Sequence, residues 1–482
     1  MQYSVVNYKT VKEGEGALRL DSEHYRKTYM DIKRKIESRK FHYLSEILSK
    51  PIVTGHTPSM ANDSYYGGGV AFVKTDNVRE HVITDNFNHY LSNEGNKKIK
   101  RSQLKNNDVV LTIIGASFDV VGRAALVTDE VLPANINQNI ALIRVDEKKF
   151  NPKLLSVYLN SFYGRNYLYF LSRQTEQVNL NNKEVERLII PHFSESIIKL
   201  ISELVEKSYK LKENSKFLYF QAEQLLLFEL ELSDWKPKHT LSFVKNFSNA
   251  KDADRFDAEY FQPKYEEIVE AVKKYIGGFD ELGNLVKIKK SVEPGSEAYQ
   301  ENGIPFVRVS NLSKFELSDN NQQFISMELY DELKTHQPQK GEILLSKDAT
   351  PGMAYYLNEE PQKMIVSGGI LRLKIDNKQA LPEYLTLVLN SIIVQKQIER
   401  DAGGSIINHW RPDQVKATLI PILGEDKQEE IKELVEKSFN DRKLSKSLLE
   451  IAKRGVEMAI ENDEQEADKW INSELVKLNI KL

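Results

Sequence analysis

Short hydrophobic runs alternate with polar stretches that contain glycine or proline over most of the chain. The runs are rich in β-branched and aliphatic residues, a composition typical of buried strands. The clearest of them are 109–114, 141–145, 343–346 and 371–375. Pro152 and Pro382 then stand where a first helical turn tolerates proline. This alternation predicts two heads of mixed α/β structure, the first head at 1–192 and the second head at 255–422.

A different pattern follows each head. Apolar and small residues recur there with the three-then-four spacing of a coiled-coil seam. The first seam comprises Ile197, Ile201, Leu204, Ser208, Leu211, Ser215, Leu218, Ala222 and Leu225, and the second comprises Ile431, Leu434, Ser438, Ser445, Leu448, Ala452 and Ala459. A helix of about 38 residues is roughly 57 Å long. We predict two long helices that pair as an antiparallel coiled coil; the alternative is that each helix packs alone on its own head.

The two halves of the chain also share sequence. Residues 201–216 read ISELVEKSYKLKENSK and residues 431–446 read IKELVEKSFNDRKLSK. Weaker matches reach back into the heads, for example RLDSEHY at 19–25 and RFDAEYF at 255–261. A duplicated unit can build a two-fold arrangement from one chain. We therefore expect an α+β protein with internal pseudo-two-fold symmetry, in which the loops differ and the scaffold is kept.

These patterns set the expected domain boundaries. At 482 residues the chain is long enough for several domains, and each half can bury its own core. The expected segments are the first head at 1–192, a central spacer helix at 193–232, a polar linker at 233–254, the second head at 255–422, a second spacer helix at 423–463 and a C-terminal tail at 464–482.

Composition narrows the class of protein. No apolar run approaches the roughly 20 residues of a membrane span, and the absence of cysteine excludes disulfides and fits a reducing compartment, so we expect a cytoplasmic protein. The net charge of −3 argues against a uniformly basic surface for nucleic acid, yet cations cluster locally. One basic run comprises Lys97, Lys98, Lys100, Arg101 and Lys105, and another comprises Lys287, Lys289 and Lys290. Taken alone, each run is typical of a solvated face.

The sequence carries no signature of catalysis. No Pro-Pro dipeptide occurs, although an amino-group methyltransferase is expected to have one, and Gly14 with Gly16 lacks the third glycine of a dinucleotide loop. The nine histidines include no i, i+4 pair that would ligate zinc from one helix face. We therefore predict no catalytic residue, no metal and no cofactor in this chain.

Both halves of the chain contain an ordered set of characteristic stretches. In the first half these are TPS at 57–59, GGGVAFVKTDNV at 67–78, VVLTIIGASFDVVGRAALV at 109–127 and NINQNIALIRV at 135–145. In the second half they are GIPFVRVSNLS at 303–313, GEILLSKDATPG at 341–352 and GGSIINHWRPDQVKATLIPI at 403–422. No single piece is a sharp motif, but the ordered set occurs twice. In these stretches and in the order of its elements the chain resembles the specificity subunit of type I restriction-modification systems.

The resemblance implies a non-catalytic subunit with two target-recognition domains, each of which reads one half of a split DNA sequence. It also implies partners: two adenine-methyltransferase subunits, which would carry S-adenosylmethionine, and restriction and translocase subunits where the complex cleaves DNA. Because the two heads differ in most loop residues, we expect the target to be asymmetric as well as bipartite.

The candidate DNA contacts are polar residues near the ends of predicted strands. Base edges are read by matching donors and acceptors, whereas phosphates are bound by cations and backbone amides. The candidates are Lys74, Thr75, Asp76, Asn77, Ser117 and Arg123 in the first head, and Arg308, Ser310, Asn311, Lys347, Thr350, Gly403, Gly404 and Arg411 in the second. Two other functions stay open at this point: a coiled-coil scaffold that bridges two protein partners, and a stand-alone enzyme with an unrecognised site.

Overall fold

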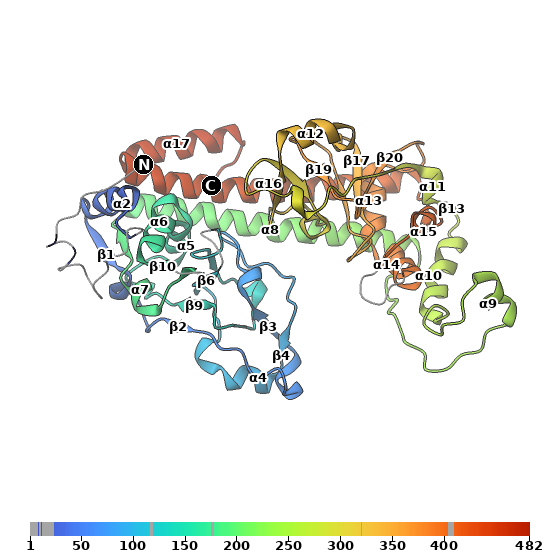
Figure 1. Cartoon of the computed structure of the whole chain (residues 1–482), viewed down its shortest axis with the longest axis horizontal. Coiled ribbons are helices and arrows are strands. Elements are labelled where there is room, and N and C mark those ends of the chain that lie inside the picture. The colour runs from blue at the N-terminus through green and yellow to red at the C-terminus, as the bar shows by residue number, and fades with distance from the viewer. Residues whose placement is uncertain are drawn as a thin grey trace. The chain divides into compact units, whose positions relative to one another are not determined.

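The computed structural model describes residues 8, 11, 24–115, 119–174, 178–319, 321–402 and 409–482 (Figure 1). The chain divides into two compact units. Unit 1 lies within Met1–Leu211 and Lys443–Leu482, and unit 2 is Lys212–Arg442. Each unit therefore combines one head with a segment of each long helix. The predicted mixture of helices and sheets is confirmed.

The head of unit 1 is built from small sheets. Its strands are β1 (Phe41–Tyr43), β2 (Val53–Thr54), β3 (Tyr66–Val73), β4 (Tyr90–Leu91), β5 (Val109–Thr112), β6 (Ile114–Gly115), β7 (Ala124–Leu126), β8 (Ala134–Ile136), β9 (Ile140–Ile143), β10 (Arg173–Gln174), β11 (Val178–Asn179) and β12 (Ile189–Pro191). They form sheets in the orders β4-β3-β8, β2-β9-β5-β7, β10-β11-β6 and β1-β12. Strands β3 and β8 run parallel.

Within the described residues, the head of unit 2 repeats all of these sheets except β10-β11-β6. Its strands are β13 (Phe279–Glu281), β14 (Val286–Lys290), β15 (Ile304–Val307), β16 (Gln323–Ile325), β17 (Glu342–Ser346), β18 (Ala354–Tyr356), β19 (Ile365–Val366), β20 (Ile370–Ile375) and β21 (Leu419–Pro421). The orders β16-β15-β19, β14-β20-β17-β18 and β13-β21 match those of unit 1, and β15 pairs parallel with β19. The sequence repeat is thus also a repeat of strand order.

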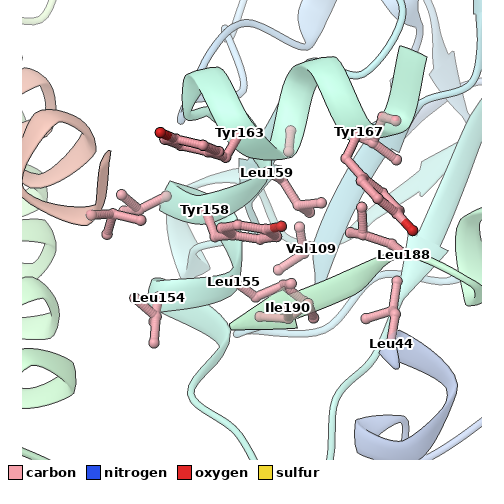
Figure 2. Close-up of a cluster of buried hydrophobic side chains, with 14 of the residues drawn as sticks. Leu44, Val109, Leu154, Leu155, Tyr158, Leu159, Tyr163, Tyr167, Leu188 and Ile190 are labelled. Atoms are coloured by element: carbon pink, nitrogen blue, oxygen red, sulfur yellow. The ribbon is translucent and has the colours of Figure 1, made fainter. Parts of the chain in front are cut away.

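Two successive helices pack on each other in each head: α5 (Pro152–Asn160) and α6 (Phe162–Leu171) in unit 1, and α13 (Pro382–Asn390) and α14 (Ile392–Asp401) in unit 2. The first helix of each pair, α5 or α13, contacts the main sheet. Figure 2 shows Leu155 and Tyr158 of α5 gathered with Val109 of β5 and Ile190 of β12. Tyr158 is fully buried, and its hydroxyl donates to Ile189 O at 2.7 Å. A buried tyrosine is tolerated when its hydroxyl has such a partner.

Shorter helices complete the two heads. They are α2 (Lys27–Glu37), α3 (Leu44–Ile47), α4 (Asn93–Lys98) and α7 (Asn182–Glu186) in unit 1, and α9 (Phe247–Ala253), α10 (Pro263–Lys274), α11 (Leu282–Leu285), α12 (Met327–Leu333) and α15 (Pro412–Lys416) in unit 2. No helix within the described ranges combines the length and the apolar character that crossing a bilayer requires.

The two long helices are α8, from Glu195 to Glu229 with 35 residues, and α16, from Glu425 to Glu461 with 37 residues. In unit 1, Ser208 Oγ donates to Ser445 O at 2.8 Å. In unit 2, Ser438 Oγ donates to Ser215 O at 2.7 Å. All four serines are buried, and small side chains at these positions let the two backbones approach each other closely.

Within unit 2 the two helix segments run antiparallel. Asn214, early in the segment of α8, contacts Asp441, late in the segment of α16, and Glu229 at the end of α8 pairs with Lys427 near the start of α16. Contacts that join the end of one helix to the start of the other require opposite directions.

The buried stripe of the long helices differs in part from the predicted seam. Tyr219 and Leu226 are buried where Leu218 and Leu225 were predicted, and Val435 is buried where Leu434 was predicted. In unit 2 these side chains share one hydrophobic core with the helices of the head. The helix segments therefore pack on their head as well as on each other. For this reason the apolar face is wider than a coiled-coil seam, and its centre lies one residue away from the centre of the predicted seam.

A further helix, α17 (Glu464–Lys477), lies within the predicted C-terminal tail. Asp463 accepts a hydrogen bond from Glu466 N at 2.9 Å and caps the helix. In unit 1 Ile471 of α17 packs directly over Gly455 of α16, where a Cβ atom would lie 2.5 Å from Ile471 Cδ1. The absence of a side chain at Gly455 therefore lets α17 pack closely against α16.

Candidate nucleic-acid interface

In the first head a buried strand ends in a short 3₁₀ turn that carries the first group of predicted contacts. The turn η2 (Thr75–Asn77) follows β3 directly. Asn77 Oδ1 accepts a hydrogen bond from Lys74 N at 2.9 Å, and its amide nitrogen donates to Asn86 O at 3.2 Å. The side chain is only 2% exposed. Asn77 therefore holds the turn from within.

The second head repeats this arrangement after β15. In the turn η6 (Val309–Asn311), Asn311 Oδ1 accepts from Arg308 N at 3.0 Å, and its amide nitrogen donates to Ser318 O at 3.0 Å. Asn311 is fully buried. Asn77 and Asn311 were both predicted to contact DNA, and in this structure the amide groups of both bond to backbone inside the turn. The two asparagines position the residues beside them.

The other residues of the two turns are more accessible. Asp76 and Ser310 are exposed, and Lys74 and Arg308 are half-buried. Within the described structure, Thr75 Oγ1 and Arg308 Nε are buried without a hydrogen-bond partner. An unpaired buried polar group costs about 1–3 kcal/mol. Its presence in the equivalent turn of both heads favours a site where a ligand supplies the missing partner.

A second predicted loop lies after β17 in unit 2 and is cross-linked by charge. Lys347 Nζ contacts the carboxylate of Asp348, which also accepts from His409 Nδ1 at 2.8 Å. Burial acts to raise the pKa of Asp348, but the hydrogen bonds from Lys347 and His409 outweigh it and the pKa is lowered. Thr350 is exposed. The loop thus presents a fixed ion cluster and a free hydroxyl.

The structure brings this loop next to the turn η6. Gly369 lies between them: a Cβ atom on it would be 2.9 Å from Val309 Cγ2 and 3.5 Å from Asp348 Oδ2. Backbone bonds from Ser367 N to Val307 O and from Lys347 N to Gly369 O complete the junction. Sequence reasoning missed this glycine turn, although a polar Ser-Gly-Gly between two hydrophobic strands was the available signal.

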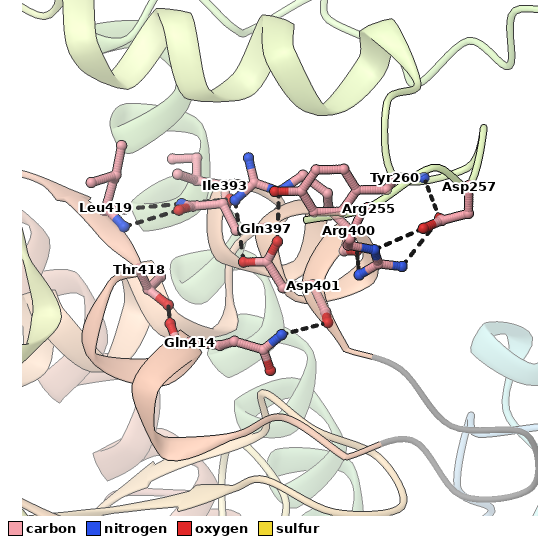
Figure 3. Close-up of polar contacts among 10 residues, drawn as sticks. All are labelled: Arg255, Asp257, Tyr260, Ile393, Gln397, Arg400, Asp401, Gln414, Thr418 and Leu419. Atoms are coloured by element: carbon pink, nitrogen blue, oxygen red, sulfur yellow. Dashed lines mark hydrogen bonds and ion pairs between the residues drawn. The ribbon is translucent and has the colours of Figure 1, made fainter. Parts of the chain in front are cut away.

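The third predicted element of unit 2 lies beside α15. Arg411 is exposed, its Nη2 is 3.2 Å from Asp413, and its backbone N–H donates to Gln414 Oε1 at 2.9 Å. Figure 3 shows Gln414 Nε2 donating in turn to Asp401 O, at 2.8 Å. Gln414 therefore ties Asp401 to Arg411 across the intervening segment. Gly403 and Gly404, also predicted here, lie outside the described residues.

The first head has an equivalent loop cluster. Asn137 N donates to Val73 O at 3.1 Å, and Ile113 N donates to Asn139 O at 2.9 Å. The exposed Gln138 between these two asparagines contacts the Thr57 hydroxyl. The polar stretch 137–139 corresponds to the Ser-Gly-Gly turn of unit 2 and was not among the predicted contacts. Its position between β8 and β9 brings it beside the turn η2.

Arg123, another predicted contact of the first head, directly precedes β7. Its backbone oxygen accepts from Thr112 N at 2.9 Å, and its N–H donates to Thr112 Oγ1 at 3.1 Å. The guanidinium is near Arg165, whose pKa is lowered by burial and, less strongly, by the charge of Arg123. Ser117, predicted in the same loop, lies outside the described residues. Arg123 therefore adds positive charge to this end of the head.

The basic runs of the sequence are exposed. In unit 1 the run lies on α4 and the turn η3 (Lys100–Ser102), with Lys97, Lys98, Lys100, Arg101 and Lys105 all accessible. In unit 2 the run lies on β14, where Lys287 pairs with Asp376 at 2.5 Å. Within the described ranges no ion pair engages Lys289 or Lys290. Exposed, unpaired lysines suit phosphate binding as well as solvation.

Comparison with known proteins identifies a known domain in the second half of this chain. Residues 278–453 match the family model described as the type I restriction modification DNA specificity domain. This stretch begins just before β13 and ends within α16, so it contains most of the second head and much of the second long helix. The resemblance to type I specificity subunits is confirmed, and the chain carries a DNA specificity domain of that family.

Individual relatives are distant. The chain is 25% identical over 123 residues to the type I restriction enzyme EcoBI specificity subunit of Escherichia coli; the match covers 26% of this chain and 25% of that relative, about a quarter of its length. The S subunit of a type I system from M. genitalium is similar at 11% identity and a TM-score of 0.33, over 92% of this chain and 96% of that one. The HsdS subunit from Thermoanaerobacter tengcongensis is similar at 14% identity and a TM-score of 0.29, over 88% and 97%.

Proposed function

We propose that this chain is the non-catalytic DNA-recognition subunit of a type I restriction-modification complex. In this proposal it reads an asymmetric, bipartite DNA target and directs adenine methylation and restriction by partner subunits. The specificity domain in 278–453 supports the assignment for the second head, and the matching strand order supports it for the first. As part of this proposal we place the two recognition domains at 1–192 and 255–422, the bounds predicted from the sequence.

The observation that carries the proposal is that one turn scaffold presents different side chains in the two heads. Asn77 and Asn311 form the same pair of hydrogen bonds, whereas the exposed positions carry Asp76 in one head and Ser310 in the other. A carboxylate accepts from the cytosine amino group, while a hydroxyl donates or accepts. The same framework with different groups is what two different half-sites require.

We assign the DNA contacts to the loop clusters at the strand ends. The proposed contacts are Lys74, Thr75, Asp76 and Arg123 in the first head and Arg308, Ser310, Lys347, Thr350 and Arg411 in the second, together with Ser117, Gly403 and Gly404, which the structure does not describe. Asn77 and Asn311 keep a positioning role. Half-buried cations at these turns suit phosphates, and the exposed polar groups suit base edges.

We further propose that α8 and α16 form an antiparallel coiled coil with pseudo-two-fold symmetry that sets the spacing of the half-sites. The repeat relates Ser208 to Ser438 and Ser215 to Ser445. The hydrogen bonds pair Ser208 with Ser445 and Ser215 with Ser438. Replacing each serine of the first pair by its counterpart in the repeat therefore gives the second pair. A two-fold axis across the helix pair would exchange these two contacts.

The partners in this proposal are double-stranded DNA, adenine-methyltransferase subunits that carry S-adenosylmethionine, and restriction subunits. The surface of α8 offers a docking site for protein. Phe217, Phe220 and Phe228 are 55%, 53% and 70% exposed, respectively. Exposed aromatic side chains are enriched at protein interfaces and are otherwise unfavourable in water. We assign them to the methyltransferase subunits.

The test is to co-express the chain with its methyltransferase partner and map methylated adenines across a genome. We expect a two-part motif with a fixed spacer. The matched variants Asp76→Ala and Ser310→Ala should each relax one half-site and leave the other unchanged. Methylation at a single unbroken motif, or the same half-site altered by both variants, would contradict the proposal.

A further inference from the structure

In unit 1 a short loop of the first head is attached to both long helices. The loop spans 79–82 and is closed by the bridge between Val78 and Ile83. Its His81 has a positive φ of 67° and donates its N–H to Ala124 O at 2.9 Å. The hydroxyl of Tyr209 on α8 donates to His81 O at 2.6 Å. The loop backbone is therefore fixed without any use of the imidazole.

The imidazole of His81 is buried without a good partner. The residue is 3% exposed, and Nε2 has no hydrogen-bond partner within the described structure. Nδ1 lies 3.4 Å from Asn160 Nδ2, but that amide already donates to Ala124 O at 2.7 Å and Ser156 O at 2.8 Å. Both amide hydrogens are thus engaged elsewhere. A buried polar atom of this kind needs a partner other than protein, either a water or an ion.

Two carboxylates lie beside this imidazole. Glu80 of the loop, Glu450 of α16 and His81 each offer one ligand atom, and these three atoms all lie within 4.8 Å of one another. Lys453 of α16 pairs with both acids, at 3.2 Å from Glu80 and 2.8 Å from Glu450. A cation therefore already lies between the carboxylates, with the unpartnered imidazole next to them.

Unit 2 makes the same attachment with different chemistry. By the repeat, Lys314 and Phe315 correspond to Glu80 and His81, because Asn311 corresponds to Asn77. On the helix, Glu223 corresponds to Lys453, and it pairs with Lys314 at 3.6 Å with the charges exchanged. Phe315 packs on Tyr219 with ring centroids 5.0 Å apart.

In unit 2 the loop is therefore attached by one ion pair and by aromatic contacts of Phe315, which also lies near Phe439 and Arg442. The position of Glu450 is taken there by Phe220, so no second carboxylate is present. The imidazole and Glu450 of unit 1 are thus additional to what the attachment requires, and they are the two groups that would complete a set of metal ligands.

We propose that His81, Glu80 and Glu450 bind a divalent transition-metal cation of the zinc type. Imidazole nitrogen with carboxylate oxygens is a donor set that Zn²⁺ accepts, with water in the remaining position. The metal takes the place of the Lys453 ammonium between the carboxylates and holds the loop to α16. The sequence analysis predicted no metal in this chain. The metal site does not depend on the proposed function.

The test is calorimetric titration of the untagged full chain with Zn²⁺ after removal of metal by a chelator. We expect one tight site, which His81→Phe abolishes while the apo protein stays folded, because phenylalanine occupies the equivalent position in unit 2. Glu450 is exposed, so Glu450→Gln cannot disturb a core, and we expect it to weaken binding at least about tenfold. Lys453→Met should bind Zn²⁺ more tightly, because a competing positive charge is removed.

The control is His192→Asn, since the rings of His42 and His192 lie 5.7 Å apart and offer an unrelated histidine pair at the surface. This variant should keep the tight site. No tight site in the parent chain, unchanged binding in His81→Phe or Glu450→Gln, or weaker binding in Lys453→Met would each overturn the proposal.

Discussion

At the scale of single residues, each head pairs a buried carboxylate with an arginine beside its main sheet, and this arginine is half-buried in unit 1 but buried in unit 2. In unit 1 Arg144 Nη2 lies 2.6 Å from Asp108. In unit 2 Arg372 Nε lies 2.8 Å from Glu342, and each of these two side chains is 2% exposed. Asp108 and Glu342 both stand at the start of the equivalent strand, so the acid is kept while the arginine has moved by two residues along the partner strand.

This difference predicts a rescue. Arg372→Leu leaves the carboxylate of Glu342 buried and unpaired, and we expect a loss of about 3–5 kcal/mol in the free energy of unfolding. Lys374 lies directly opposite Glu342 in the β17–β20 register and is exposed. Adding Lys374→Arg places a guanidinium where the first head has Arg144 and should restore part of the loss. Urea denaturation of the single and double variants measures it; a double variant no more stable than Arg372→Leu would refute the account.

Glu399 on α14 should make the stability of the folded protein depend on pH. Burial acts to raise the pKa of Glu399, but hydrogen bonds from Lys396, Lys264 and Tyr265 outweigh it and hold the pKa at about 2. The carboxylate is 42% exposed, so solvent screens these contacts. Because the folded pKa is below the unfolded value of about 4.3, the stabilisation is present above that pH and is lost as the pH falls toward 2.

The matching measurement compares the wild type with Glu399→Gln by urea denaturation between pH 6 and pH 3. We expect the wild type to be the more stable at pH 6 and the difference to shrink steadily below about pH 4.3. A difference that stays constant with pH would show that the contacts of Glu399 do not depend on its charge.

At the scale of elements, the contact between the long helices depends on small residues. Ser438 is fully buried and bonds to Ser215 in unit 2. Ser438→Ala removes one hydrogen bond and should cost about 1 kcal/mol. Ser438→Leu inserts bulk where the backbones approach and should cost about 1–3 kcal/mol through overpacking. Thermal unfolding measures both; Lys437→Leu, at a site 62% exposed, is the control and should change little.

At the scale of the whole molecule, the proposed spacer makes a prediction about length. Inserting seven residues into both helices, after Lys212 and after Asp441, adds two turns and keeps the serine pairs in register. Each helix lengthens by about 10.5 Å, which corresponds to about three base pairs of duplex at 3.4 Å each. We expect the methylated motif to gain about three base pairs of spacer with both half-sites unchanged.

The control is an insertion of four residues after Lys212 alone. It rotates the apolar face of α8 relative to the rest of the helix and leaves α16 unmatched, so methylation should be lost rather than shifted. An unchanged spacer in the double insertion would show that the helices do not set the half-site separation.

The sequence by itself determined the elements and their repetition. Runs such as 109–114 and 371–375 form strands, Pro152 and Pro382 begin helices, and the identical letters of Glu203–Ser208 and Glu433–Ser438 mark the equivalent helix segments. These features are local: periodicity, helix-start residues and hydrophobic patterning act within a few residues of chain. For the same reason the family resemblance was available from sequence before any contact was known.

Only the tertiary structure decided which polar residues are accessible and which are enclosed. Asn77 and Asn311 have side chains of a type that reads bases, but these side chains lie inside their turns. The segment 137–139 and Gly369 join the loops, although neither was among the predicted contacts. His81 and Glu450 come from distant parts of the chain and meet only because α16 packs beside the first head's loop in unit 1. Burial and such long-range contacts depend on how elements pack, which no short stretch of sequence encodes.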